Sequence, residues 1–158
     1  MRKPGSGPSP ARRLAEGVCV LLLTAAQAPP APLVPFAIRA DGIEAPLTGR
    51  PGDPVRGRAI VADRVLSACL LCHSGPFPDP NLQGSIAPPL DRVGARLSAP
   101  QIRLRLADPS RLNPDTIMPS YYATQGLKRV GAAWRDRPIL SAEQVEDVVA
   151  FLATLRGP

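Results

Sequence analysis

The sequence predicts a small all-α fold, in which an irregular N-terminal extension precedes three to four short helices. Two segments of the 158-residue chain open with helix-capping patterns and continue with apolar residues at helical spacing. No segment shows the alternation of apolar and polar residues that indicates a strand. Residues 74–97 and 108–140 have loop compositions and are long for a domain of this size, so we expect them to enclose a bound group.

The first helix is expected to begin at Asp53 and Pro54, because Asp caps helices well and Pro suits the first helical position. A partly apolar face should continue from there toward residue 69. It comprises Val55, Ala59, Ile60, Ala62, Val65 and Leu66. Gly57 lowers the helix propensity of this segment, which indicates close packing against another element.

Residues 98–101 and residues 141–144 each form a capping box, with Ser at the N-cap and Gln three positions later. The first box opens a short helix that should end at about Ala107, before Pro109. The second starts the clearest helix of the chain, which Gly157 ends. Its apolar stripe comprises Val145, Val148, Val149, Leu152 and Leu155.

Residues 69–73 read Cys69-Leu70-Leu71-Cys72-His73, which is the C-x-x-C-H spacing of a covalent haem attachment site. Two thiols three positions apart can form thioethers with the two vinyl groups of a porphyrin, and the adjacent His can bind the iron. The motif therefore predicts one covalently bound haem c, with thioethers at Cys69 and Cys72 and an axial ligand at His73. A buried porphyrin would also enlarge a core that contains only six aromatic residues after the N-terminal leader.

The motif has three other interpretations. A structural zinc site needs four ligands, and beyond the motif the chain offers only Cys19 and no further His. A thioredoxin-like dithiol would lie next to strands, which the sequence does not predict. A disulfide between Cys69 and Cys72 would close a very small loop.

Met118 is the predicted second axial ligand. Apart from the initiator it is the chain's only Met, and Pro119 restricts it to extended backbone in a stiff loop. Iron held by His and Met is closed to substrate, which suits electron transfer. A buried core Met is the alternative. Tyr121 or Tyr122 could ligate instead, but we expect both to pack against the haem or to bond a propionate.

Residues 1–28 have the pattern of a cleavable signal peptide, with a basic start, an apolar run at residues 18–23 and small residues at Ala26 and Ala28. The Arg12-Arg13 pair leaves twin-arginine export as an alternative to the general secretory route. A retained anchor is a further alternative, although the apolar run is shorter than the roughly 20 residues of a membrane span. We therefore expect a periplasmic protein with no membrane span after cleavage.

Residues 29–52 are rich in Pro, Gly and Ala, which predicts extended, irregular backbone. A disordered leader and a strap across a partner both remain open for this extension, and residues 53–157 form the main domain. Without the leader the formal charge is 15 − 12 = +3. No basic stripe with interleaved aromatic residues occurs, so nucleic-acid binding is not expected.

The order of helix, C-x-x-C-H motif, Pro-Leu loop, short helix, Met-Pro loop and C-terminal helix resembles that of class I c-type cytochromes. In that fold the first and last helices cross at a small residue, and Gly57 against Phe151 would match this crossing. The resemblance also implies that the carbonyl of Pro88 accepts the Nδ1–H of His73 and so fixes its tautomer. A plain Pro turn at residues 87–90 is the alternative.

Beyond about residue 40 the chain is similar to SoxX, the monohaem subunit of the SoxAX cytochrome of bacterial thiosulfate oxidation. The most specific stretch is residues 111–122, Arg-Leu-Asn-Pro-Asp-Thr-Ile-Met-Pro-Ser-Tyr-Tyr. Residues 45–49, 52–54, 57–62, 69–74, 94–98 and 139–149 also match. Ala87 departs from the pattern, because Gly is expected before the Pro pair.

The resemblance implies that His73 and Met118 are the axial ligands and that Cys69 and Cys72 form the thioethers. It implies a heterodimer with a SoxA-like haem subunit, in a complex that oxidatively joins thiosulfate to a cysteine of a SoxYZ-like carrier protein. This chain would relay the electrons to a soluble acceptor. No catalytic residue carries over, so the chain would be the redox subunit of an L-cysteine S-thiosulfotransferase complex.

Two other functions remain open. The chain could be a free-standing periplasmic cytochrome c that carries electrons for another redox system. It could also be a non-redox binding protein with a metal or a disulfide at Cys69 and Cys72.

Overall fold

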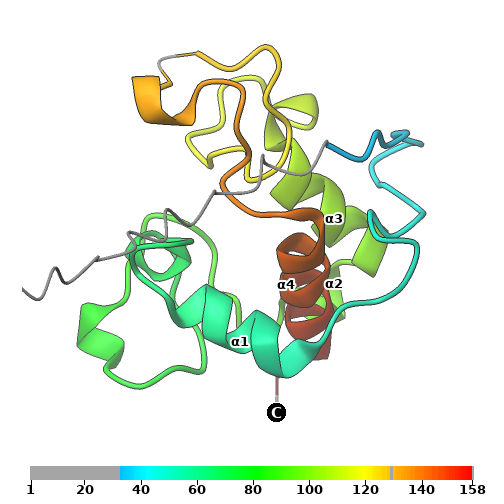
Figure 1. The fold of residues 1–158 in the computed structure, drawn as a ribbon. Helices are drawn as coiled ribbons and strands as arrows, with labels where there is room; N and C mark the ends of the chain where they lie inside the picture. Colours follow the sequence, from blue (N-terminus) through cyan, green and yellow to red (C-terminus); the bar gives the residue numbers. More distant parts are fainter. Residues whose placement is uncertain (1–32, 129, 158) are drawn as a thin grey trace, which may run out of the picture. The chain divides into compact units, whose positions relative to one another are not determined.

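The computed structural model describes residues 33–128 and 130–157 (Figure 1). Its α-helices are α1 (Pro54–Ala62), α2 (Val93–Arg96), α3 (Ala99–Ala107) and α4 (Ala142–Thr154). Single 3₁₀ turns are η1 (Cys69–Leu71), η2 (Pro80–Leu82), η3 (Pro109–Arg111) and η4 (Ala132–Trp134). Within the described part of the chain the only β pairing is one isolated bridge between Arg39 and Gly42. The expected signal peptide, residues 1–28, lies outside the described residues.

Helix α1 begins where the sequence predicts, but it is shorter than expected. The carboxylate of Asp53 accepts hydrogen bonds from the backbone N–H groups of Val55 and Arg56, which caps the first turn. The helix ends at Ala62, because the carboxylate of Asp63 binds the next two free N–H groups, at Val65 and Leu66.

The expected apolar face of this segment is partly wrong. Val55 is 77% exposed and Val65 is 95% exposed, and within α1 the buried residues are Gly57 and Val61. The capping turn at Asp63 redirects the chain, so helical spacing no longer applies beyond Ala62.

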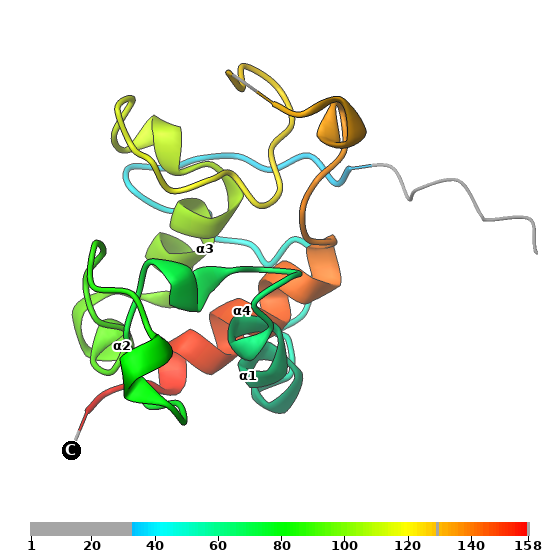
Figure 2. The same ribbon diagram turned by 90° about the vertical axis from the view of Figure 1, so that its left-hand side faces the viewer.

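Helices α1 and α4 cross in close contact, and the crossing point is Gly57 (Figure 2). A Cβ atom on Gly57 would overlap the carbonyl oxygen of Asp147 and lie 2.8 Å from the Cβ of Phe151. Next to the crossing, the ring of Phe151 meets that of Phe77 edge to face, with centroids 5.8 Å apart. The mid-helix Gly therefore permits the two backbones to approach, as expected.

We expect Gly57→Ala to lower the free energy of unfolding by about 1–3 kcal/mol, because even one methyl group overpacks this crossing. Chemical denaturation of the haem-loaded protein measures the change. Val55→Ala, on the exposed side of the same helix, is the matched control and should stay within about 0.5 kcal/mol of the parent. Equal stability of the Gly57→Ala variant and the parent would contradict the close crossing.

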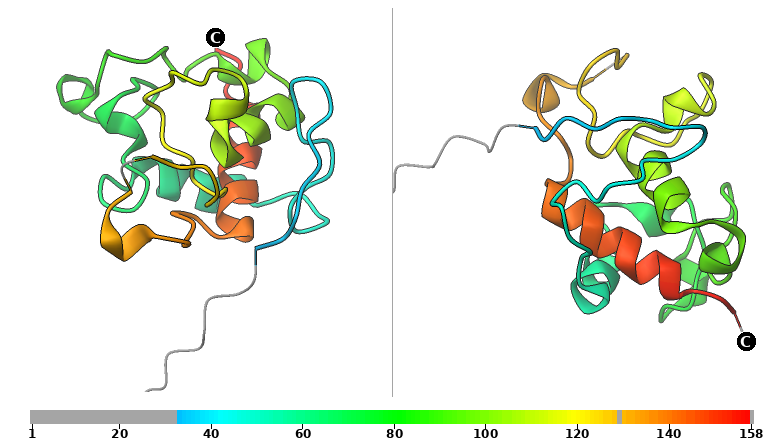
Figure 3. Two further views of the ribbon diagram at one scale, coloured as in Figure 1. Left: turned by 90° about the horizontal axis from the view of Figure 1, so that it is seen from above. Right: turned by 90° about the vertical axis from the view of Figure 1, so that its right-hand side faces the viewer.

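The segment from Gly42 to Gly52 packs on the helices of its own chain (Figure 3). Ile43 and Leu47 are buried, and the N–H of Ile43 donates to the carbonyl of Pro100 at the start of α3. The N–H of Leu47 donates to the carboxylate of Glu146 on α4. This segment thus closes one side of the core.

A buried ion pair lies beneath that segment. The guanidinium of Arg103 on α3 binds both carboxylate oxygens of Glu146, at 2.7 and 2.9 Å. It also donates to the carbonyl of Ile43 at 2.6 Å. The side chains of Arg103 and Glu146 are only 5% and 1% exposed. One ion pair that is shielded from water therefore links α3, α4 and the segment from Gly42 to Gly52.

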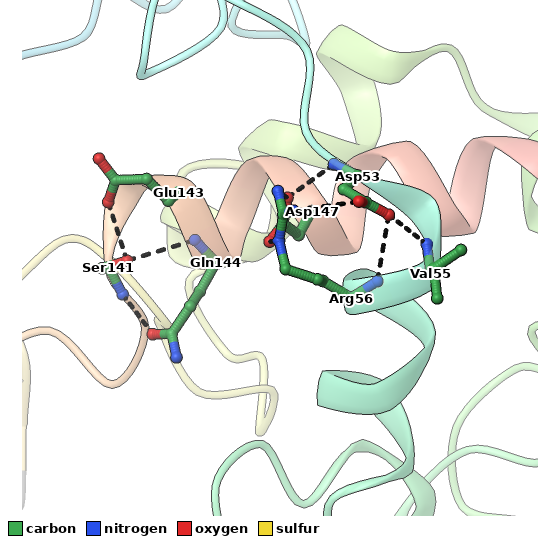
Figure 4. A network of polar contacts seen from close by, with 7 residues as sticks. All are labelled: Asp53, Val55, Arg56, Ser141, Glu143, Gln144 and Asp147. Carbon is green, nitrogen blue, oxygen red and sulfur yellow. Dashed lines mark hydrogen bonds and ion pairs between the residues drawn. The ribbon is translucent and has the colours of Figure 1, made fainter.

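Asp147 joins the start of α1 to α4 (Figure 4). Its carboxylate accepts hydrogen bonds from the N–H of Asp53 and from the guanidinium of Arg56. Burial opposes ionisation, but the bonds from Arg56 and Asp53 outweigh it and hold the pKa of Asp147 below its ordinary value of 3.8.

The stabilisation by Asp147 should depend on pH. Because the folded pKa is below the unfolded one, the carboxylate contributes its full stability above about pH 4 and loses it as the pH falls below that value. We expect Asp147→Asn to be less stable than the parent at pH 7, and the difference to shrink as the pH drops below 4. Denaturation at several pH values tests this, and a constant difference from pH 3 to 7 would contradict it.

No helix within residues 33–128 and 130–157 is long and apolar enough to cross a membrane.

Candidate functional site

The chain enters the C-x-x-C-H motif through a tight turn. The carbonyl of Asp63 accepts the N–H groups of Ser67 and Ala68. Ala68 has a φ of +55°, a left-handed conformation that is uncommon for a residue with a side chain and is found at functional turns. The 3₁₀ turn η1 follows directly, and the N–H of His73 donates to the carbonyl of Cys69 at 3.0 Å. This local winding holds the motif in one compact loop.

The backbone of residues 84–90 lies against the motif and fixes it. The carbonyl groups of Leu70, Cys72 and Ser74 accept hydrogen bonds of 2.8–3.0 Å from later N–H groups. Those donors are Gly84, Ala87 and Leu90, in that order.

Gly84 makes this close approach possible. A Cβ atom there would overlap the carbonyl oxygen of Leu71 and come within 2.7 Å of the Cα of Cys72. Ala87, where the family pattern has Gly, is not among the described residues with positive φ, so its backbone does not require Gly.

The same loop orients the imidazole of His73. Its Nδ1 atom lies 2.7 Å from the carbonyl oxygen of Pro88. A carbonyl can only accept, so Nδ1 carries a proton, and in the neutral imidazole Nε2 is then the atom with the lone pair. The expected contact at Pro88 is present, and it leaves Nε2 as the atom that can bind a metal.

Met118 lies in a loop tied to the end of α3. Its N–H donates to the hydroxyl of Thr116, and the hydroxyl of Ser120 donates to the carbonyl of Ala107. The N–H of Tyr121 donates to the carbonyl of Leu106. Met118 is half-buried against the core, so a polarisable thioether is held in a defined place.

Two pockets, of about 510 and 500 Å³, meet between the motif and the Met118 loop. Cys69 and Cys72 line the first pocket only, and His73, Pro88 and Met118 line both. The remaining shared lining residues are Leu90, Leu106, Asn113, Thr116 and Leu152. The structure therefore brings together all five residues that the sequence predicts for the site.

The two tyrosines, which the sequence predicts to pack against the haem or to bond a propionate, lie in different places. Tyr121 lines the first pocket; its hydroxyl donates to the carbonyl of Ser67 at 2.6 Å and lies 3.8 Å from the sulfur of Cys69. Burial, and then the neighbouring Cys69, raises the pKa of Tyr121 well above its ordinary value, so it stays a neutral donor. Tyr122 lines neither pocket, and its hydroxyl bonds Val34 instead.

The residues present fit a haem. Each pocket lies within the 300–1,000 Å³ typical of cofactor sites, and the shared lining is mainly apolar. The thiols of Cys69 and Cys72 are not joined in a disulfide. Among residues 33–128 and 130–157 no group of three or more His, Cys, Asp or Glu side chains is placed to hold a metal ion.

The fold is similar to that of a solved chain in the crystal structure of SoxXA from P. pantotrophus, with a TM-score of 0.69. The two sequences are 38% identical over 77% of this chain and 94% of the solved one. The chain belongs to the SoxX family. It is a haem-binding cytochrome of the SoxAX type of sulfur oxidation, and the small cytochrome c fold predicted from the sequence is confirmed. No family model matches the chain, and no curated protein matches it.

Sequence reasoning missed several residues of this SoxX-family site. Gly84 was not singled out, although a Gly in a loop beside a cofactor motif is a signal of close backbone approach. Arg96 and Arg105 line the second pocket, and the sequence assigned neither of them a role. Arg96 lies within the stretch 94–98 that resembles SoxX, and nothing in the local sequence distinguishes Arg105 from an ordinary surface arginine.

Proposed function

We propose that this chain is the electron-relaying subunit of a periplasmic thiosulfate-oxidising complex. In this proposal it carries one covalent haem c, with thioethers at Cys69 and Cys72 and with His73 and Met118 as axial ligands. The observation that carries the proposal is that His73 and Met118 both line the two adjoining pockets, while the two thiols line the pocket on one side.

When bound, the haem supplies a one-electron iron couple. The carbonyl of Pro88 then sets the tautomer of His73. Tyr121 closes the side of the site next to Cys69. Apolar side chains exclude water from the site, namely Leu90, Leu106 and Leu152. If the imidazole of His73 and the thioether of Met118 both bound the iron, no position would remain for a substrate. The chain would thus pass electrons without binding thiosulfate itself.

Three exposed apolar side chains surround the mouth of the first pocket. Leu71, Ile86 and Ile117 line it and are 51%, 70% and 81% exposed. Large apolar groups at a pocket rim favour a contact with another protein. The proposal therefore places the SoxA-like haem subunit at this rim.

The complete proposal follows the resemblance of the chain to SoxX. A SoxA-like subunit would form the heterodimer, and a SoxYZ-like carrier would present the cysteine to which thiosulfate is joined. Residues 1–28 would direct export to the periplasm and then be removed, leaving residues 29–52 as an N-terminal extension to the cytochrome domain at residues 53–157.

Co-purification tests this function. A tagged chain recovered from the periplasm of its thiosulfate-grown host should bring a second haem protein with it in equal amount. Ile117→Asp should weaken that association while the variant keeps its haem, and Val55→Asp, a similarly exposed residue on α1, should not. A haem-loaded chain that elutes alone from thiosulfate-grown cells would contradict the complex and favour the free-standing carrier.

A further inference from the structure

The second pocket also contains positively charged side chains, which are not among the predicted haem ligands. Arg96 and Arg105 line it, and neither of them lines the first pocket. No Asp or Glu is among the described residues that line this pocket, and most of the other side chains there are apolar. Arg105 is half-buried beside these apolar side chains, where a nearby anion would stabilise its charge, and Arg96 is exposed at the same pocket.

The hydrogen bonds of these arginines leave most of their donors available. Within the described part of the chain, Arg105 makes one side-chain hydrogen bond, to the carbonyl of Gln101 at 3.0 Å. Arg96 likewise makes one, to the carbonyl of Pro89 at 2.9 Å. Each guanidinium carries five N–H groups, and neither one has a carboxylate partner among the described residues.

Arg56 and Arg103 provide the contrast. Both form ion pairs with carboxylates of α4. Arg105 is half-buried on α3, two positions after Arg103, yet it lines the pocket and has no carboxylate partner among the described residues. The pair at the second pocket is therefore suited to an acidic group that comes from outside the protein chain.

The positions of the thiols and the arginines identify this acidic group. Cys69 and Cys72 line only the first pocket, the arginines line only the second, and His73 and Met118 line both. A porphyrin attached through its vinyl edge at the thiols carries its propionate carboxylates away from that edge. We propose that Arg105, assisted by Arg96, binds the haem propionates, an inference that rests on the haem attachment in the proposed function.

The proposed contact affects the redox equilibrium. A guanidinium beside a propionate offsets its negative charge and so favours the reduced, less positive iron. Arg105 is less exposed than Arg96, so its charge is less screened by solvent and should have the larger effect. Both are positioning residues, because they would bind the cofactor's edge and not its iron.

Redox titration of the haem-loaded protein, together with its resonance Raman spectrum, tests the proposal. Arg105→Gln should lower the equilibrium constant for reduction by up to about tenfold, which is 59 mV for a one-electron couple. The propionate bending bands, which report hydrogen bonds to the carboxylates, should shift. Arg105→Lys should recover most of the potential, because it restores the charge. Arg96→Gln should act in the same direction but more weakly.

Arg50→Gln is the matched control, since it removes the same charge from an exposed side chain that lines neither pocket. Unchanged propionate bands in both Arg96→Gln and Arg105→Gln would overturn the proposal, even if the potential falls through the lost charge alone. A protein that acquires no covalent haem would instead refute the proposed function. The two failures are therefore distinguishable.

Discussion

Replacing Glu146 by Leu is expected to lower the free energy of unfolding by about 3–5 kcal/mol, because it leaves the charge of Arg103 buried without a partner. The pair is almost completely shielded from water, and Arg103 also bonds the carbonyl of Ile43. The same substitution removes the acceptor for the N–H of Leu47. The segment from Gly42 to Gly52 should therefore detach from α3 and α4 when the ion pair is lost.

Guanidinium unfolding of the haem-loaded protein measures this change. The double variant Arg103→Met with Glu146→Leu should be more stable than Glu146→Leu alone, since no unpaired charge then remains in the core. Glu44→Leu, an exposed position whose carboxylate makes no hydrogen bond within the described part of the chain, is the control and should change stability by about 0.5 kcal/mol or less. A loss below about 1 kcal/mol in Glu146→Leu would show that the pair is solvated in solution.

Replacing Met118 by Ala is expected to have the largest effect on the redox properties. The substitution removes the only methionine in the described part of the chain. A water molecule would then bind that side of the iron, or the position would stay empty. The weak long-wavelength sulfur-to-iron band should disappear. The reduction potential should fall by a substantial part of the roughly 0.8 V range that axial ligands span.

Absorption spectroscopy and redox titration of the purified variant provide the measurement. Ile117→Ala is the matched control, because it shortens the neighbouring exposed side chain and removes no ligand. The covalent haem should persist in both variants, since Cys69 and Cys72 are unchanged. If Met118→Ala keeps both the band and the potential, the sixth ligand lies elsewhere.

The starts of α1, α3 and α4 could be predicted because each depends on local chemistry. The N-caps at Asp53, Ser98 and Ser141 are short-range hydrogen-bond patterns, and all three have the expected partners. The predicted end of α1 was wrong, because the carboxylate of Asp63 accepts hydrogen bonds from Val65 and Leu66 and so forms a turn that competes with the helix. The predicted place of Val65 on the apolar face of this helix was wrong for the same reason.

The remaining differences come from contacts between segments that are distant in the sequence. The four-residue helix α2 packs on α4, where Gly94 lies against the carbonyl of Ala153, and no local pattern indicates this. Likewise the Pro-rich composition of residues 29–52 predicted irregular backbone but left its packing open. The contacts of Ile43 and Leu47 depend on a buried ion pair formed by residues about 60 and 100 positions later.

The most direct test of this account is the colour of the protein after export with a working cytochrome-maturation system. The purified protein should be red, should absorb in the Soret region, and should keep its haem through denaturing acid-acetone extraction. A variant with Cys69→Ser and Cys72→Ser should lose the haem in the same extraction. A colourless parent protein, or one that releases its haem into acid-acetone, would contradict the covalent haem on which the proposed function depends.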